Sequence, residues 1–352
     1  QAQTADYKFN RLTIYNGLSQ NMVHCLTQDY LGYMWFGTKD GLNRYDGYTF
    51  KIYKSDLFDP ASICDNQINY LYEDDKHNLW IGTRKGLSLY DRENDRFINF
   101  EREKITKNSL VVNCISGNSK DGLWISSFGG EIIGLDIVYT PGKRTPEVKL
   151  KRIITKAEIR NDRAENILLE KNDALWIFGI NGISHLDLRS GTIDTTGSQY
   201  QTYLFQPESS KSRISANKYS PFHSPMQEGI MDENGLLWFI GKEGLYKFDK
   251  KNRQFVFYKL NEWAKTLISK VNNSGDTEIW IGLFYQGINI INTRTGHIDK
   301  VTTESLGEEK GTDMWITKFC KGRDGTVWLG TSGWGIIYSS PINSMFKKET
   351  PH

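Results

Sequence analysis

The chain has 352 residues, 38% of them hydrophobic, and a formal net charge of only +2 from 44 basic and 42 acidic residues. This near balance, without any basic block, gives little support for a nucleic-acid partner. No apolar run approaches the roughly 20 residues that a membrane-spanning helix needs. The hydrophobic content is enough for a large core, and the length alone would suggest about two domains.

One phrase recurs along the chain and overrules that two-domain estimate. Its clearest copy, LWIGTRKGLSLYD, spans residues 79–91. The Trp of this phrase returns about every 45 residues, a period that is typical of propellers and other repeat arrays. Its seven positions are Trp35, Trp80, Trp124, Trp176, Trp238, Trp280 and Trp328.

Each copy predicts four antiparallel strands, a to d. Strands b and c are the apolar run around the Trp and the run that follows a Gly-bearing break. Strand a lies upstream, as in residues 23–28 and 68–73, and strand d lies downstream, as in residues 50–53 and 254–258. Turn residues such as Asp29 separate strands a and b and suit hydrogen bonds to the local backbone. A ring of seven such units buries the sheet faces that a single unit would expose to solvent. The sequence therefore predicts an all-β, seven-bladed β-propeller over residues 1–340.

The two ends of the chain predict how this ring closes. Residues 1–6 read as a loose tail, and residues 7–12 read as a strand that belongs to no blade of its own. Blade 7 has strands b and c, up to Tyr338, but the chain reaches Pro341 without a strand d. We therefore expect the N-terminal strand to complete blade 7. Residues 341–352 read as the start of a linker to a following domain, and the start at Gln1 without Met suggests a processed or trimmed segment.

Three blades depart from the common pattern in the loop between strands b and c. Blades 3, 6 and 7 carry one extra residue there, within residues 126–130, 283–287 and 331–335. Each of these loops contains an aromatic residue where the other blades have polar or small ones. The aromatic residues are Phe128, Phe284 with Tyr285, and Trp334. A further irregularity is a long excursion over residues 200–225, between blades 4 and 5.

The four cysteines argue against metal or redox chemistry. No CxxC spacing is present, which disfavours a zinc site or a dithiol centre. Cys25 and Cys114 share one repeat position, but blades 1 and 3 are not neighbours. We expect all four cysteines, the others being Cys64 and Cys320, to be free thiols that are mostly buried as small apolar groups. No regular acidic loop indicates calcium, and the six His form no cluster in the sequence. We expect no metal and no cofactor.

The repeats resemble a known family. The stretches NGLSQNMVHCLTQDYLGYMWFGTKDGLNRYDGYTFKIY (residues 16–53) and DNQINYLYEDDKHNLWIGTRKGLSLYD (residues 65–91) are similar to the two-component-regulator propeller repeat. The resemblance is weaker in blades 3, 4 and 5, where Ser126, Phe178 and Ile240 replace the first Gly. It implies the first propeller of the periplasmic sensor region of a Bacteroides-type hybrid two-component system. It also implies a full receptor with a second propeller, an immunoglobulin-like domain, a membrane helix, cytoplasmic kinase and response-regulator parts, a homodimeric state and oligosaccharide ligands.

The end of the ring that carries the b–c loops is the predicted contact surface. The seven motif Trp residues are expected to be structural, because every repeat has one. Exposed aromatic rings beside polar groups suit a sugar, whose C–H faces stack on rings while its hydroxyls find polar partners. The alternative is that the rings pack on adjoining loops or a neighbouring domain and that the charged residues are only solvated. The candidate contact residues are Phe128, Phe284, Tyr285, Gln286, Trp315, Trp334, Arg84, Lys85, Lys39 and Asp40.

The sequence favours a non-catalytic sensor that recognises glycan-derived oligosaccharides, alone or together with a second propeller. Histidine kinase activity would then belong to other domains of the receptor. One alternative is a propeller enzyme, such as a polysaccharide lyase or hydrolase, because this fold also supports catalysis. Another is a pure dimerisation scaffold. A convergent acid–base pair at the mouth of the ring would favour the enzyme.

Overall fold

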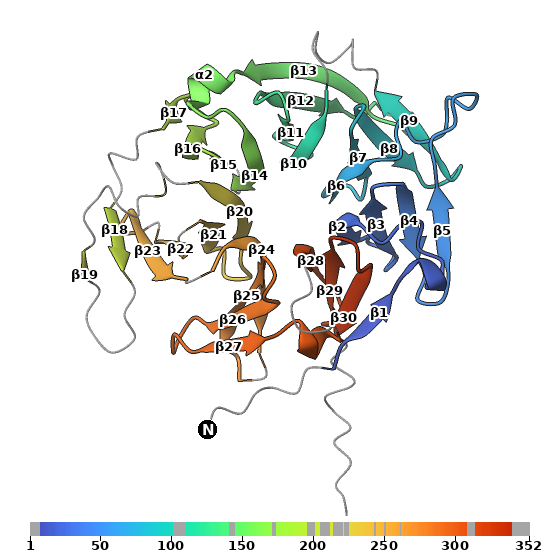
Figure 1. Cartoon of the computed structure of the whole chain (residues 1–352). Helices are drawn as coiled ribbons and strands as arrows, with labels where there is room; N and C mark the ends of the chain where they lie inside the picture. The colour runs from blue at the N-terminus through green and yellow to red at the C-terminus, as the bar shows by residue number, and fades with distance from the viewer. Residues whose placement is uncertain are drawn as a thin grey trace, which may run out of the picture.

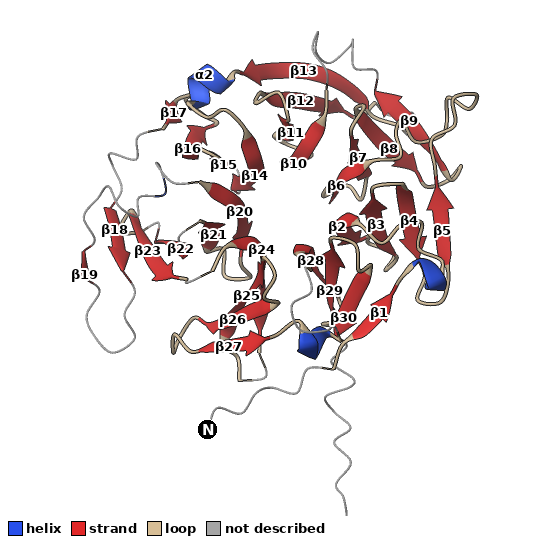
Figure 2. Cartoon of the chain, in the orientation of Figure 1, coloured by secondary structure: helices blue, strands red, loops and turns tan. Residues whose placement is uncertain are grey.

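Each repeat folds into the predicted antiparallel sheet, and seven sheets surround a central axis in the computed structural model (Figure 1). The regular structure is almost entirely strand, with a few short helical turns (Figure 2). The all-β class and the seven blades are therefore confirmed. The structure describes residues 8–100, 110–140, 145–170, 174–195, 201–204, 212–213, 221, 225–242, 244–249, 251–260, 262–272, 274–307 and 314–339.

Strands a to d follow one another in sequence within each of the first three blades. Blade 1 consists of β2 (Val23–Gln28), β3 (Met34–Thr38), β4 (Gly41–Tyr45) and β5 (Phe50–Tyr53). Blade 2 consists of β6 (Ile68–Glu73), β7 (Leu79–Thr83), β8 (Leu87–Asp91) and β9 (Arg96–Phe100). Blade 3 consists of β10 (Val112–Asn118), β11 (Gly122–Ser127), β12 (Ile132–Val138) and β13 (Glu147–Ile154).

The remaining blades keep the same order. Blade 4 consists of β14 (Ala164–Glu170), β15 (Ala174–Gly179), β16 (Gly182–Asp187) and β17 (Ile193–Asp194). Blade 5 contains β20 (Met226–Met231), β21 (Leu237–Gly241), β22 (Gly244–Asp249) and β23 (Gln254–Lys259). Blade 6 consists of β24 (Ala264–Val271), β25 (Thr277–Leu283), β26 (Ile288–Asn292) and β27 (Ile298–Val301). Blade 7 contributes β28 (Ile316–Lys321), β29 (Val327–Thr331) and β30 (Ile336–Ser339). The helical turns are η1 (Ile14–Asn16), α2 (Lys156–Ile159) and η3 (Glu304–Leu306).

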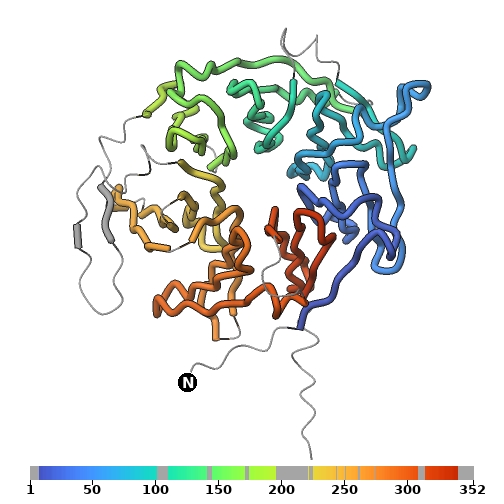
Figure 3. Tube along the Cα trace, viewed as in Figure 1, coloured from blue at the N-terminus to red at the C-terminus, as the bar shows by residue number. Residues whose placement is uncertain are grey.

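The N-terminal strand closes the ring, as predicted. Strand β1 (Asn10–Leu12) pairs antiparallel with β30, with Asn10 opposite Tyr338 and Leu12 opposite Ile336. In Figure 3 the blue start of the chain meets the red final blade. The strand begins at Asn10 rather than at Tyr7, which lies outside the described residues. Residues 341–352, the predicted linker, also lie outside them.

The excursion before blade 5 adds strands that the sequence pattern did not predict. Strand β18 (Gln201–Leu204) lies parallel to β23, and β19 (Ser212–Arg213) pairs with β18. Blade 5 therefore has six strands where the other blades have four. A short parallel pairing of this kind depends on contacts distant in sequence, so no local turn or repeat signal indicates it.

A hydrogen bond from the indole holds the motif Trp in four of the blades. The indole Nε1–H donates to a carboxylate at the preceding a–b turn. In blade 1 this carboxylate is Asp29, which also accepts hydrogen bonds from the backbone N–H groups of Leu31 and Tyr33. The indole donor–acceptor distances are 2.8 Å for Trp35–Asp29, 2.9 Å for Trp80–Asp74, 2.7 Å for Trp176–Glu170 and 2.9 Å for Trp238–Asp232. A carboxylate that bonds both the indole and the backbone fixes the turn and the ring together.

The hydrophobic core is divided among the seven junctions between blades. Seven clusters of buried residues each combine side chains from two neighbouring blades. Each motif Trp belongs to the junction with the following blade, so that Trp35 packs between blades 1 and 2 and Trp328 packs between blades 7 and 1. A blade without its neighbour would expose one of its two apolar faces.

Removal of β1 is predicted to destabilise the whole ring. Deletion of residues 1–12 removes the pairing with β30 and exposes the edge of blade 7, so the melting temperature measured by circular dichroism should fall by several degrees. Deletion of residues 1–7 removes none of this pairing and serves as the control. A melting temperature that is the same in both truncated proteins would contradict the closing role of β1.

Candidate functional site

The b–c loops and the d–a connections share one end of the ring, which we call the loop face. In every blade the first residue of the b–c loop donates its N–H to the carbonyl of the residue just before strand a, at 3.1–3.2 Å. The seven donor–acceptor pairs are Lys39–Met22, Arg84–Gln67, Phe128–Val111, Ile180–Arg163, Lys242–Pro225, Phe284–Trp263 and Ser332–Trp315. The predicted contact residues of these loops therefore occupy equivalent places around one face. The a–b and c–d turns form the opposite end, the turn face.

Three aromatic rings meet on the loop face between blades 6 and 7. Phe284 lies 5.2 Å and Tyr285 lies 5.6 Å from Trp315 between ring centroids, and Phe284 also forms a backbone bridge to Trp315. We call these three residues the aromatic cluster. Tyr285 is 49% exposed and Trp315 is 37% exposed, so the cluster presents ring surface to solvent. Beside it, Lys242 lies over the exposed ring of Trp263, at 5.2 Å from its centroid.

Two other predicted aromatic residues do not join this cluster. The ring of Trp334 packs against the core between blades 6 and 7, and Arg11 of β1 lies 5.5 Å from its centroid. Trp334 thus contacts the closing strand, in the blade next to that of Tyr285. Phe128 is exposed but belongs to blade 3, where Arg163 of blade 4 lies 5.8 Å from its ring. The three extended loops therefore form separate surfaces.

The predicted polar residues of the loop face are divided between ion pairs and solvent. Asp40 pairs with Lys54 at 2.6 Å, and Lys85 pairs with Asp65 at 3.1 Å. The amide of Gln286 faces the carboxylate of Glu262. Arg84 is exposed. Surface ion pairs of this kind contribute little to stability.

A ring of polar side chains, which the sequence prediction missed, lies at the inner edge of the loop face. In every inner strand the pairing with strand b shifts register at the second residue, which forms a β-bulge. We call these seven residues the polar ring. They are His24, Asn69, Asn113, Glu165, Gln227, Lys265 and Thr317, and all are half-buried. The sequence did contain a signal, because the residue before each of them is apolar or Ala, whereas this position is always polar.

The next residue of each inner strand forms a second, deeper layer across the axis. This axial layer consists of Cys25, Tyr70, Cys114, Asn166, Glu228, Thr266 and Lys318. Lys318 of blade 7 pairs with Glu228 of blade 5, and its Nζ also lies 5.3 Å from the ring centroid of Tyr70 in blade 2. Contacts between blades this far apart show that the layer crosses the channel.

The lysine of the axial layer is paired with a carboxylate, and its two thiols are buried. Burial lowers the pKa of Lys318, but the neighbouring Glu228 carboxylate outweighs burial, so the pKa lies above its ordinary value. Burial raises the pKa of the Cys25 thiol to about 12 and also raises that of Cys114. Both thiols are therefore protonated near neutral pH and are poor nucleophiles. All four cysteines are free, as predicted.

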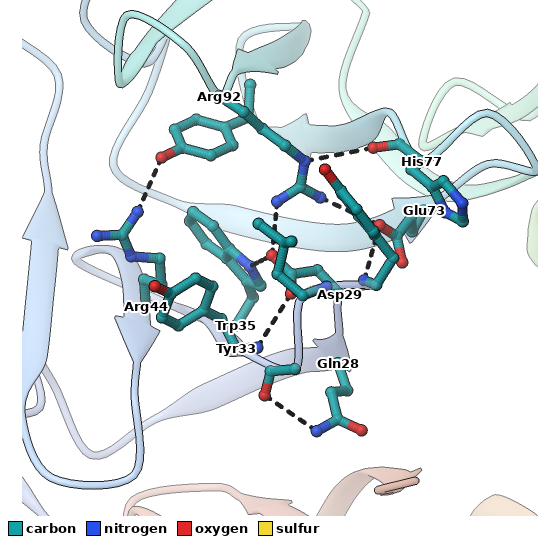
Figure 4. A network of polar contacts seen from close by, with 12 residues as sticks. Gln28, Asp29, Tyr33, Trp35, Arg44, Glu73, His77 and Arg92 are labelled. Carbon is teal, nitrogen blue, oxygen red and sulfur yellow. Dashed lines mark hydrogen bonds and ion pairs between the residues drawn. The ribbon is translucent and has the colours of Figure 1, made fainter.

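The turn face contains a network that joins blades 1 and 2 (Figure 4). Arg92 donates to Asp29 at 2.6 Å and to Glu73 at 3.1 Å, while Glu73 accepts the backbone N–H of Tyr30 at 3.0 Å. Tyr30 stacks on His77 with centroids 4.4 Å apart, beside a cavity of about 310 Å³. Asp29 is fully buried, so its charge requires these partners. The network therefore stabilises the contact between blades 1 and 2.

The described residues contain neither a metal-binding group nor a membrane-spanning helix. No cluster of three or more His, Cys, Asp or Glu side chains that could hold a metal ion occurs in this part of the chain. No helix among the same residues is long and apolar enough to cross a bilayer.

The Lys318–Glu228 pair provides a test of the axial layer. The variant Lys318→Met leaves a buried carboxylate without its partner and should lower the free energy of unfolding by about 3 kcal/mol in urea denaturation. The double variant Lys318→Met/Glu228→Leu removes both charges and should recover most of that loss. Additive effects of the two substitutions would show that the pair does not couple blades 5 and 7.

Comparisons with known proteins agree with this architecture. The two-component regulator propeller model matches residues 17–40 and 62–85, in blades 1 and 2. A solved extracellular domain of a hybrid two-component system from B. thetaiotaomicron is 22% identical, with a TM-score of 0.70 over 95% of this chain. A virginiamycin B lyase from Staphylococcus aureus is 12% identical, with a TM-score of 0.65. At these identities the likeness of the two structures concerns the fold alone.

One relative is similar over a shorter stretch. Histidine kinase P4 from Formosa agariphila is 46% identical over 63 residues, which are 18% of this chain and 5% of the kinase. The chain spans 42% of the B. thetaiotaomicron extracellular domain. The histidine kinase and the B. thetaiotaomicron domain are thus much longer than the segment that each shares with this chain, whereas the lyase is matched over 99% of its length. The chain therefore carries repeats similar to the two-component regulator propeller in blades 1 and 2, within a seven-bladed ring.

Proposed function

We propose that this propeller is a non-catalytic sensor module of a hybrid two-component receptor and recognises glycan-derived oligosaccharides through its loop face. A periplasmic location, a second propeller that shares the ligand, and a homodimeric receptor with kinase domains belong to the same proposal. Its support is the match of the repeats in blades 1 and 2, together with two longer similar proteins, a histidine kinase and the extracellular domain of a hybrid two-component system.

The observation that carries the ligand proposal is the aromatic cluster. Phe284, Tyr285 and Trp315 come from two blades and present ring surface on the same face as the polar ring. A cluster of exposed apolar side chains commonly marks a surface that contacts another molecule. A pyranose or furanose ring can stack its C–H face on Tyr285 or Trp315 while its hydroxyls bond to neighbouring polar groups. A sugar is therefore a better match to this surface than a purely apolar partner.

The contacts within the polar ring favour binding over catalysis. A general acid–base mechanism needs a titratable group positioned by a partner. Burial, and then the charge of Lys39, lower the pKa of His24, and no carboxylate contributes to that shift. Glu165 is paired with Arg163 at 2.8 Å. The lyase alternative rests on a shared fold at 12% identity, and fold alone does not transfer an activity.

Loss of the aromatic cluster should weaken sugar binding without unfolding the ring. The double variant Tyr285→Ala/Trp315→Ala removes two stacking surfaces, each worth about 0.5–1.5 kcal/mol, so affinity measured by calorimetry should fall about tenfold. Both side chains are substantially exposed, so the melting temperature should stay close to that of the wild type. Tyr48→Ala is the matched control, because Tyr48 is 91% exposed outside the cluster. Equal losses in both variants would contradict the assignment.

The bound sugar should remain intact. Incubation of the purified chain with each oligosaccharide that it binds, followed by mass spectrometry, should return the starting compound, because no acid–base pair is positioned in the polar ring. Cleavage that is retained through purification and is abolished by His24→Ala would instead establish an enzyme.

A further inference from the structure

We propose that the polar ring binds an uncharged, hydroxyl-rich ligand end, such as the terminal residue of a neutral oligosaccharide. The inference rests on the proposed function and assigns a site to it. The aromatic cluster would then hold a neighbouring sugar residue, while the axial end of the chain enters the polar ring.

The first support is the pattern of burial along the seven inner strands. The first residue of each strand is buried in a blade junction, whereas the second is half-buried and polar in all seven blades. A position within a buried strand that remains polar in every repeat requires either a polar partner or contact with solvent. The β-bulge re-aims the side chain at this position, as bulges next to binding sites commonly do.

Three members of the polar ring hold the blades in place. Asn69 donates to the carbonyl of Val112 at 2.9 Å, and Asn113 donates to that of Ala164 at 2.7 Å. Thr317 likewise donates to the carbonyl of Val23 at 2.6 Å. Each acceptor is the first residue of the next inner strand. This structural role accounts for three of the seven positions.

The other four members are His24, Glu165, Gln227 and Lys265, and their contacts suit a neutral ligand. Glu165 is compensated by Arg163, and Lys265 donates to the amide of Gln227 at 3.3 Å. Below them, the charges of Lys318 and Glu228 cancel in the axial layer. Amide, imidazole, ammonium and carboxylate groups provide both donors and acceptors, which is what a set of sugar hydroxyls requires.

The aromatic residues continue directly into this ring. Trp315 precedes Thr317 by two residues at the start of β28, and Trp263 precedes Lys265 in the same way at the start of β24. The stacking surfaces and the polar ring therefore succeed one another from the loop face toward the axis. The axial layer, whose side chains are mostly buried, lies beneath them. A ligand that stacks on the aromatic cluster would thus present its next residue to the polar ring.

Calorimetric titration with a defined panel tests this site. The probes are cellotetraose, xylotetraose, mannotetraose and arabinotetraose, with trigalacturonate as the acidic comparison. The variants are Gln227→Ala and Lys265→Ala, with Gln227→Leu as a substitution that preserves volume. We expect the affinity for the best neutral probe to fall at least tenfold in each variant, while the melting temperature without ligand stays within about 2 °C of the wild type, because neither residue bonds the backbone of the next blade.

The outcomes separate the site from the proposed function. Wild-type affinity in all three variants, together with loss in Tyr285→Ala/Trp315→Ala, would overturn the polar-ring site and leave the sensor proposal standing. Tighter binding of trigalacturonate than of every neutral probe would overturn the uncharged ligand class. A wild-type chain that binds no probe, alone or within the full receptor, would overturn both proposals.

Discussion

The contact on which the structure depends is the motif Trp at each junction, packed against the next blade and, in four blades, hydrogen-bonded to a turn carboxylate that is buried in three of them. Burial of apolar surface in the ring contributes a stabilising free energy of about 25 cal/mol per Å². The carboxylate accepts a hydrogen bond from the indole N–H, which burial would otherwise leave without a partner. Blade 3 shows what this contact requires. Asn118 directs its amide to Asp121, and the indole of Trp124 is left without a hydrogen-bond partner among the described residues.

Because every blade repeats the same pairing, each repeat position becomes a ring of side chains around the axis. The first loop residues, the polar ring and the axial layer are three such rings at increasing depth. Positions that face a junction are apolar in every blade, whereas many positions on the loop face, unlike Trp334 and the three polar-ring residues that bond the next blade, are free of that packing. The fold therefore separates stability from recognition, and differences among blades, such as Tyr285 and Lys265, are free to define a ligand.

Much of this architecture could be predicted from local sequence patterns. The spacing of the Trp residues predicted the seven blades, because each blade is built from consecutive strands. The absence of a strand d after Tyr338 predicted the closure by β1, because the repeat pattern shows which strand blade 7 lacks. The polar ring was missed, although its signal was present, because a β-bulge is visible only once two strands are paired in register. The pairing of Arg92 with Asp29 and the packing of Trp334 beside Arg11 depend on residues distant in sequence, which no local pattern specifies.

The central claim is that the loop face, and not the turn face, contacts the ligand. Hydrogen–deuterium exchange of the chain with and without a bound oligosaccharide tests it most directly, because backbone protection reports the site without any substitution. The account predicts slower exchange in peptides that contain residues 262–267, 283–287 and 314–318, with no change in residues 29–33 and 74–78. Protection confined to the turn-face peptides, beside the cavity at Tyr30 and His77, would contradict it.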